Sequence, residues 1–332
     1  MSEIMRAALV KKFGGPEVLN PAEVPRPEPE EGEVLIELEA AGVNRADVLT
    51  RSGGYHAAGQ PPIVPGLEGS GVVREVGASV TEVSPGDRVF AFGGRPGFYA
   101  EYAVAPARHV VRVPEGLGMD VASTLPVAPL TAFYCLRRLA RVEPGETVLV
   151  WAAASGVGDV AVQLAKAAGA TVIATAGSDE KVAWVLENGA DHGVNHSNES
   201  VVDRVTELLG GAGAEVVLDT VGGARFGESL KAAGHGGRVV SLANVALESS
   251  TIDTRDFYPK NVAIYGFQVN NLIRRLGYDP REDLAELAGF VVGGDLKIHV
   301  DRTFGLGEAA DAHRHLEGRL NRGKVVLRPR EG

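Results

Sequence analysis

The sequence has a single cysteine, Cys135, among its 332 residues. A lone thiol can form neither an intrachain disulfide nor a four-cysteine zinc site, so we interpret Cys135 as a buried packing residue in a reducing compartment. Long apolar runs are missing as well. None approaches the roughly 18 residues of a membrane span, and the N-terminus lacks the apolar core of a signal peptide. These absences predict a cytoplasmic protein with no membrane partner.

Positive charge is also in short supply. The 33 Lys and Arg residues are outnumbered by 43 Asp and Glu residues, which gives a net charge of -10. An acidic chain repels phosphate backbones, so no nucleic-acid partner is expected. Aromatic residues make up only 6% of the chain, yet the hydrophobic fraction is 45%, which excludes a disordered chain. At roughly 150 residues per domain, the length predicts about two domains.

The chain changes texture near residue 124. Before it, short β-like runs separated by Gly and Pro predict a β-rich unit. After it, apolar strand candidates alternate with helical spacing, which predicts an α/β unit with a doubly wound parallel sheet. The predicted strands of this series are 147–151, 171–175, 215–219, 237–242 and 262–266, and its helices are 156–168, 179–187, 200–209 and 224–233. In the tail, helices 281–293 and 307–318 precede a strand, 324–328, that we expect to return to the first unit.

The strongest local motif is the segment WAAASGVG at 151–158, between a predicted strand and a predicted helix. Small residues there let a pyrophosphate approach the backbone, and the helix start offers unpaired N–H groups. The segment can be aligned as Gly156-x-Gly158-x-x-Ala161 or as Ala153-x-Ser155-x-x-Gly158; the second follows the strand directly and is preferred. We therefore predict that Ser155, Gly156, Val157 and Gly158 bind the phosphates of a dinucleotide. A plain strand-to-helix turn is the alternative.

The choice of cofactor depends on the end of the next strand. An acid about 20 residues beyond the loop would accept from the ribose 2′-OH and select NAD. Ser178 occupies that position, and Lys181 follows it. A hydroxyl and a lysine in place of the acid favour the 2′-phosphate of NADP(H). As alternatives, Ser178 caps a helix and Lys181 lies on a solvated face.

Further short motifs are spread over the whole length. They are FGGPEVL at 13–19, AGVNRAD at 41–47, RSGGY at 51–55, PGLEGSGVV at 65–73, PGDRV at 85–89, QLAK at 163–166, GAD at 189–191 and GKVV at 323–326. With these motifs the chain resembles the zinc-independent quinone oxidoreductases, the zeta-crystallin-like branch of the medium-chain dehydrogenase/reductase superfamily. The resemblance implies a GroES-like β-rich domain at 1–123 and 268–332 and a Rossmann domain at 124–267. It also implies a homodimer or homotetramer formed through the edge of the Rossmann sheet.

The chain departs from the zinc enzymes of that superfamily at two ligand positions. They carry Cys where this chain has Asn44, and Gly-His-Glu where it has Gly66-Leu67-Glu68. Leu cannot ligate zinc and Asn is a poor ligand, so no metal is expected. Without a Lewis acid, the favoured chemistry is hydride delivery from NADPH to an electrophilic acceptor, a quinone or an α,β-unsaturated carbonyl.

The resemblance also assigns site residues. Asn44 and Tyr55 match the family's catalytic cleft, where each could donate a hydrogen bond to a substrate oxygen; a capping amide and a packed aromatic ring are the alternatives. Another family tyrosine is replaced by Leu49, which suggests a more apolar pocket. A family arginine that often follows position 196 is replaced by Ser197, so the phosphate clamp has lost a charge. Matches to cofactor-binding segments are Thr131, Gly177, Ser178, Lys181, His196, Ser241, Leu242, Ala243, Asn244, Phe267, Gln268, Val269 and Lys324.

Three functions stay open at this point. An NADPH-dependent quinone oxidoreductase is preferred, and loss of the aromatic at Leu49 favours an NADPH-dependent alkenal or enone double-bond reductase as the alternative. A non-catalytic nucleotide- or RNA-binding crystallin-like protein is the third. The sequence does not choose the acceptor, one- or two-electron reduction, or the strictness of NADPH over NADH.

Overall fold

A computed structural model describes residues 3–55, 59–245 and 247–331. The chain forms two compact units. The first contains the chain up to Leu130 together with the chain from Asn270 onward, and the second is Thr131–Val269. The first unit is therefore built from two segments that are distant in sequence.

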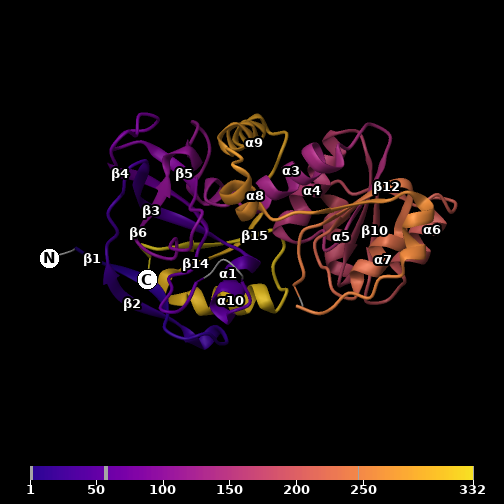
Figure 1. Cartoon of the computed structure of the whole chain (residues 1–332), viewed down its shortest axis with the longest axis horizontal. Helices are drawn as coiled ribbons and strands as arrows, with labels where there is room; N and C mark the ends of the chain where they lie inside the picture. Colours follow the sequence, from indigo (N-terminus) through magenta and orange to yellow (C-terminus); the bar gives the residue numbers. More distant parts are fainter. Residues whose placement is uncertain (1–2, 56–58, 246, 332) are drawn as a thin grey trace. The chain divides into compact units, whose positions relative to one another are not determined.

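The first unit is organised around the long strand β3 (Glu33–Val43). Its sheet has the order β14-β15-β3-β4-β5-β7, with β6 also paired to β3, and β1 pairs with β2 separately. Figure 1 shows the yellow strands β14 and β15 beside the indigo strand β3. Val325 of β15 lies opposite Val43 of β3, which confirms the prediction that a late strand returns to the first unit. The remaining strands are β1 (Ile4–Val10), β2 (Leu19–Pro25), β4 (Glu68–Val76), β5 (Arg88–Phe92), β6 (Tyr102–Pro106), β7 (Val110–Arg112), β14 (Val300–Gly305) and β15 (Lys324–Arg328).

Helices complete the core of this unit. Val34, Ile36 and Leu38 of β3 share one face of the strand and belong to this core, because successive side chains of a strand point to opposite faces. Leu35, on the other face, is buried as well. Ala309 and Ala312 of α10 pack into the same core as Val325 and Leu327 of β15. The helices of this part are α1 (Arg45–Ser52), α2 (Met119–Ala122), α8 (Val269–Leu276), α9 (Arg281–Gly293) and α10 (Ala309–Glu317).

The second unit is a parallel sheet with the strand order β10-β9-β8-β11-β12-β13. Right-handed crossovers place α4 and α5 on one face and α6 and α7 on the other, because the order reverses between β8 and β11. Ligands of such sheets bind at the strand ends of this reversal. The elements are α3 (Ala128–Tyr134), β8 (Thr147–Val150), α4 (Gly156–Ala167), β9 (Thr171–Ala176), α5 (Asp179–Glu187), β10 (His192–Asn195), α6 (Val201–Leu208), β11 (Ala214–Asp219), α7 (Arg225–Ala232), β12 (Ala233–Ser241) and β13 (Ala263–Gly266).

The burial of Cys135 agrees with its predicted packing role. Its thiol is fully buried in a π-helical segment, Cys135–Ala140, that continues α3. Burial raises the pKa of this thiol well above its ordinary value, so the reactive thiolate is suppressed. In the ranges that the structure describes, no helix has the length and apolar character needed to cross a membrane.

Candidate active site

The predicted phosphate loop lies between β8 and α4 and is fixed by the neighbouring strands. The Ala153 N–H donates to the Thr175 carbonyl oxygen at 2.8 Å, and the Ala152 N–H donates to the Thr175 hydroxyl at 3.2 Å. On the other side, the Thr220 hydroxyl donates to the Trp151 carbonyl oxygen at 2.7 Å. Bonds from the ends of β9 and β11 thus hold the loop on both sides.

The start of α4 fits a bound diphosphate. Ser155 caps the helix, with its Oγ accepting from the Gly158 N–H at 3.1 Å. A Cβ on Gly158 would lie 2.5 Å from the Ala152 carbonyl oxygen, so only glycine allows the helix to pack this closely on the loop. The N–H groups of Gly156 and Val157 belong to the first turn, whose donors have no intrahelical acceptor. These donors and the helix dipole suit an anion.

The predicted ribose-phosphate residues gather at the ends of β9 and β10. The ring of His196 lies over Gly177, since a Cβ there would be 3.4 Å from His196 Cε1. The Ser197 hydroxyl donates to the Gly177 carbonyl oxygen at 3.0 Å. Ser178 caps α5, with its Oγ accepting from the Lys181 N–H at 3.3 Å. Ser178 is thus a helix cap, as the alternative interpretation predicted, and it directly follows Gly177 in the chain.

Asp219, at the end of β11, was missed in the sequence analysis. It is fully buried, and its Oδ1 accepts from the N–H groups of Val221 at 2.9 Å and Gly222 at 2.7 Å. Its Oδ2 accepts from the Ser229 hydroxyl at 2.8 Å. An Asp three residues before a Gly-Gly pair is typical of a side-chain-stabilised turn, and this signal could have identified it. Asp219 shapes the loop that leads into α7.

The segments predicted to line the nicotinamide meet at the ends of β12 and β13. The Phe267 N–H donates to the Ser241 carbonyl oxygen at 2.9 Å. A Cβ on Gly222 would collide with the Ala243 carbonyl oxygen, so the loop after β11 touches the same place. The ring of Phe267 stacks on Tyr134 of α3 at a centroid distance of 5.3 Å, and Thr131 is buried on α3. The other predicted members, Leu242, Asn244, Gln268 and Val269, belong to these two segments.

In the first unit, Asn44 and Lys324 are in direct contact. The Lys324 ammonium donates to Asn44 Oδ1 at 2.6 Å and to Glu68 Oε1 at 2.9 Å. Lys324 is 3% exposed and Glu68 is 0% exposed, so the ion pair is removed from water. Glu68 Oε2 accepts from the Val127 N–H at 2.7 Å. Burial raises the pKa of Glu68, while Lys324 acts in the opposite direction.

These contacts change how Asn44 is read. Its Nδ2 donates to Glu68 Oε1 at 2.7 Å and to the Gly42 carbonyl oxygen at 3.4 Å, while its Oδ1 accepts from Lys324. The expected free donor toward a substrate oxygen is therefore engaged within the first unit. Only the long bond to Gly42 leaves an N–H that a substrate oxygen could capture at little cost.

A second buried network supports Asn44 from behind. The Asn44 N–H donates to Asp47 Oδ2 at 2.8 Å, and the Tyr99 hydroxyl donates to the same oxygen at 3.3 Å. Tyr99 also contacts His313 Nε2 at 3.1 Å, and Arg51 contacts His313 Nδ1 at 3.2 Å. Because arginine only donates, Nδ1 of His313 accepts and its Nε2–H donates to Tyr99.

Burial favours the uncharged form of both His313 and Asp47, which lie at the two ends of this network. Burial lowers the pKa of His313 to about 3, aided by the charge of Arg51. Burial also raises the pKa of Asp47 to about 7, against the hydrogen bond from the Asn44 N–H. The Arg51 guanidinium is paired with Glu317 at 2.8 Å. The sequence analysis did not identify this network, which joins α1 to α10.

Tyr55 lies just past α1. Its side chain is half-buried, and its N–H donates to the Leu49 carbonyl oxygen at 3.1 Å. Leu49 is itself half-buried on α1. Tyr55 and Leu49 are thus linked through the backbone at the end of one helix.

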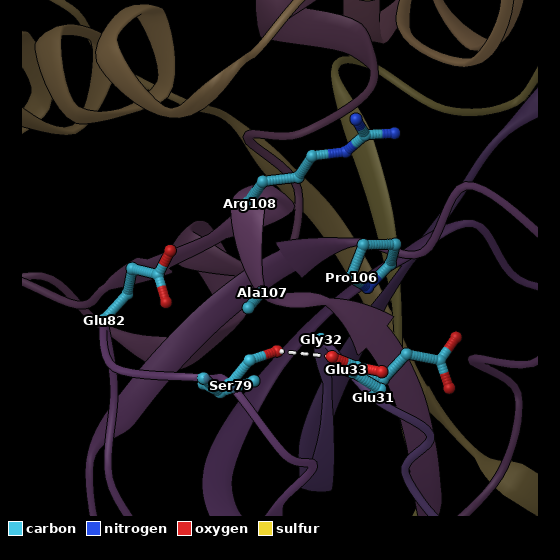
Figure 2. Close-up of a pocket in the computed structure, with 9 residues that line it drawn as sticks. Glu31, Gly32, Glu33, Ser79, Glu82, Pro106, Ala107 and Arg108 are labelled. Atoms are coloured by element: carbon cyan, nitrogen blue, oxygen red, sulfur yellow. Dashed lines mark hydrogen bonds between the residues drawn. The ribbon is translucent and has the colours of Figure 1, made fainter.

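The first unit also has an open hollow of about 460 Å³, shown in Figure 2. None of the predicted site residues lines it. Its charged lining consists of three carboxylates and Arg108, and the Ser79 hydroxyl donates to Glu31 at 3.4 Å. Across the described ranges, no group of three or more His, Cys, Asp or Glu side chains is arranged to hold a metal ion. The other two carboxylates that line the hollow are Glu33 and Glu82.

Comparison with protein families gives two matches. Residues 30–115 match the alcohol dehydrogenase GroES-like domain, and residues 156–291 match the zinc-binding dehydrogenase family. A quinone oxidoreductase of Pseudomonas aeruginosa is 36% identical over 325 residues, covering 96% of this chain and 97% of its own. The chain therefore belongs to the medium-chain dehydrogenase/reductase superfamily, in its quinone oxidoreductase branch.

Solved structures give the same result. A quinone oxidoreductase of Pseudomonas syringae pv. tomato is 33% identical and superimposes with a TM-score of 0.90, over 98% of this chain and 100% of that one. A mycobacterial protein solved in complex with NADPH is 34% identical, with a TM-score of 0.91 and the same coverage. The predicted pairing of a GroES-like domain with a Rossmann domain is thereby confirmed.

Proposed function

We propose that this protein is an NADPH-dependent quinone oxidoreductase that transfers a hydride to a quinone without zinc. The observation that carries the proposal is the buried cluster of Asn44, Glu68 and Lys324. In this cluster Asn44 stands at the position where the zinc dehydrogenases of the superfamily carry a cysteine ligand, and its Oδ1 accepts from the Lys324 ammonium. The quinone oxidoreductases among its relatives and the NADPH bound to one structural neighbour support the same function.

The residues of the second unit would hold the cofactor. Ser155–Gly158 would bind the diphosphate at the start of α4, and the group at Gly177, Ser178, Lys181 and His196 would bind the adenosine phosphate. The segments around Thr131, Ser241–Asn244 and Phe267–Val269 would line the nicotinamide. NADPH supplies the hydride when it is bound.

The residues of the first unit would act on the acceptor. A quinone that gains a hydride develops negative charge on an oxygen, and fixed positive charge stabilises such an oxyanion. Lys324 is a buried cation of this kind, and its three N–H groups are directed to Asn44, Glu68 and the Val43 carbonyl oxygen. Because Glu68 offsets the charge of Lys324, Lys324 would act mainly by orienting Asn44, whose second N–H would reach the acceptor. Tyr55 would donate from its phenol.

A double-bond reductase is the alternative, favoured by Leu49 in place of the family's tyrosine. The test is oxidation of NADPH and NADH with 9,10-phenanthrenequinone and with trans-2-hexenal. We expect turnover with the quinone and a kcat/KM for NADPH at least roughly tenfold above that for NADH. Turnover with the enal alone would replace the proposal by the alternative. Absence of both turnover and NADPH binding would favour a non-catalytic protein.

We propose a homodimer formed through β13, which lies at the end of the second unit's sheet and pairs with β12. An edge strand presents N–H and C=O groups that can pair with another chain, and Ile264 of β13 is 41% exposed. A two-fold axis there would pair two β13 strands antiparallel. A homotetramer of two such dimers is the larger form.

We expect Ile264→Lys to place two ammonium groups near that axis and convert the dimer to a monomer of 34.7 kDa. Light scattering coupled to size exclusion measures the mass. Leu320→Lys, at a residue 64% exposed in the first unit, is the matched control and should leave the mass unchanged. A wild type that runs as a monomer contradicts the assembly.

We also propose that the protein is cytoplasmic. Recovery of the protein from a membrane or secreted fraction would contradict this location.

A further inference from the structure

We propose that Arg225 determines the preference for NADPH, by supplying a positive charge for the 2′-phosphate that the sequence pattern around His196 has lost. The inference deepens the proposed function and depends on it. A family arginine is replaced by Ser197, and the hydroxyl of Ser197 donates to Gly177. Arg225, on the opposite face of the sheet, brings a guanidinium to the His196 carbonyl oxygen.

The geometry rests on three contacts within the second unit. Arg225 is the first residue of α7, and its NH2 group donates to the His196 carbonyl oxygen at 3.4 Å. Its guanidinium carbon lies 5.8 Å from the centre of the Trp151 ring. That ring is 6.2 Å from the His196 ring. Arg225 is thus directed back from α7 toward the ends of β8 and β10.

The backbone before Arg225 makes this direction possible. Gly222 and Gly223 have φ angles of +68° and +57°, a left-handed conformation that glycine adopts without strain. Asp219 holds the first part of this turn by accepting from the Gly222 N–H. The turn therefore carries the chain from β11 into α7 with the first side chain near His196.

The chemistry of the side chain suits a phosphate. A guanidinium has five N–H groups in a planar fork that matches phosphate oxygens. One nitrogen of Arg225 donates to Glu228 at 2.7 Å, and another makes the long bond to His196. The Arg225 and Glu228 side chains are 38% and 31% exposed. A partly exposed pair of this kind contributes little free energy, so a doubly charged phosphate can compete with Glu228 for the guanidinium.

The acidic side chain next to the proposed phosphate site makes a hydrogen bond of its own. Asp179 is the acid closest in sequence to Ser178, and its Oδ1 accepts from Asn195 Nδ2 at 2.6 Å. Glu228 is thus the carboxylate that directly opposes Arg225. Removing it should strengthen phosphate binding, whereas removing Arg225 should weaken it. This opposite sign is what a merely structural role for the pair would not produce.

The test is calorimetric titration of the full-length protein with NADP⁺, NAD⁺ and 2′,5′-ADP. Arg225→Gln should weaken NADP⁺ and 2′,5′-ADP roughly tenfold or more, because a charge-assisted hydrogen bond is lost, and change NAD⁺ by less than about twofold. Glu228→Gln should tighten the two phosphate-bearing ligands about two- to fivefold. Arg204→Gln removes a comparable pair with Glu207 three residues on and should change nothing.

Other outcomes overturn the inference. Equal losses for NADP⁺ and NAD⁺ in Arg225→Gln would mean that Arg225 contacts the shared part of the nucleotide or only shapes the loop. Unchanged binding in that variant would remove Arg225 from the site. A wild type that binds both dinucleotides equally would overturn the inference while leaving hydride transfer to quinones standing. A wild type that binds neither would overturn the proposed function as well.

Discussion

Lys324→Met is expected to lower the free energy of unfolding by about 3–5 kcal/mol, because it leaves the carboxylate of Glu68 buried and unpaired. Glu68 is 0% exposed, and Lys324 is its ion-pair partner at 2.9 Å. Methionine has a similar length and keeps the packing of the stem, so the loss of charge dominates. Urea unfolding followed by circular dichroism, at equal pH for both proteins, measures the change.

The deficit of Lys324→Met should grow as the pH rises. Burial already raises the pKa of Glu68, and Lys324 opposes that shift. Without Lys324 the pKa rises further, so the folded variant takes up a proton that the unfolded chain releases above its ordinary pKa of 4.5. The folded state of the variant therefore loses stability as the pH rises from 4.5 toward the higher pKa of Glu68 in the folded variant. The variant should therefore be closest to wild type in acid.

Two controls make this prediction specific. Adding Glu68→Gln to Lys324→Met removes the stranded charge and should restore much of the stability. Arg6→Met breaks an exposed pair with Glu101, whose side chains are 47% and 22% exposed, and should cost less than about 1 kcal/mol. If the single variant at Lys324 is no worse than Arg6→Met, the buried pair is unimportant for stability.

Gly158→Ala is expected to weaken NADPH binding roughly a hundredfold, because a displacement of about 1 Å at a binding loop can have that effect. The new Cβ would lie 2.5 Å from the Ala152 carbonyl oxygen and 2.6 Å from Ala153 Cα. Both are backbone atoms, so the loop must move away from α4. The same overpacking should lower the free energy of unfolding by about 1–3 kcal/mol.

Gly289→Ala is the matched control. Gly289 lies inside α9, where an added Cβ would meet nothing within 4 Å. Alanine is preferred to glycine in a helix by about 1 kcal/mol, so this variant should be as stable as wild type or more so. NADPH titration and urea unfolding measure both variants. Wild-type affinity in Gly158→Ala would contradict the assignment of this loop to the diphosphate.

The parallel sheet was predictable because its strands are buried on both faces. Strands of that kind are continuous apolar runs, and the predicted 171–175 and 215–219 agree with β9 and β11 to within a residue. Helix α1 was not predicted as a helix, because RADVLTRS has little apolar periodicity. The start of this segment was interpreted only as part of the motif AGVNRAD at 41–47. Strand β14 was also missed, because it depends on pairing with β15 rather than on its own pattern. Helix α8 was missed although its apolar residues Val269, Leu272, Ile273 and Leu276 recur at helical spacing.

The sequence pointed to single candidate residues but not to the contacts between them. Asn44 and Lys324 were each singled out, yet their contact joins positions 280 residues apart. It exists because Val325 lies opposite Val43 when β15 pairs with β3. No local pattern carries that register. Arg225 was missed for the same reason, because its approach to His196 depends on a turn after β11.

The position of β15 in the sheet also affects the order in which the two units can fold during synthesis on the ribosome. Its neighbour β3 is made early, but the strand that completes that sheet comes only near the end of the chain. The whole of Thr131–Val269 is synthesised in between as one continuous segment. Domains usually fold as they emerge, with the N-terminal one first. Here the second unit can fold before the first unit is complete. Until β15 has been synthesised, Glu68 lacks the lysine that pairs with it in the folded protein.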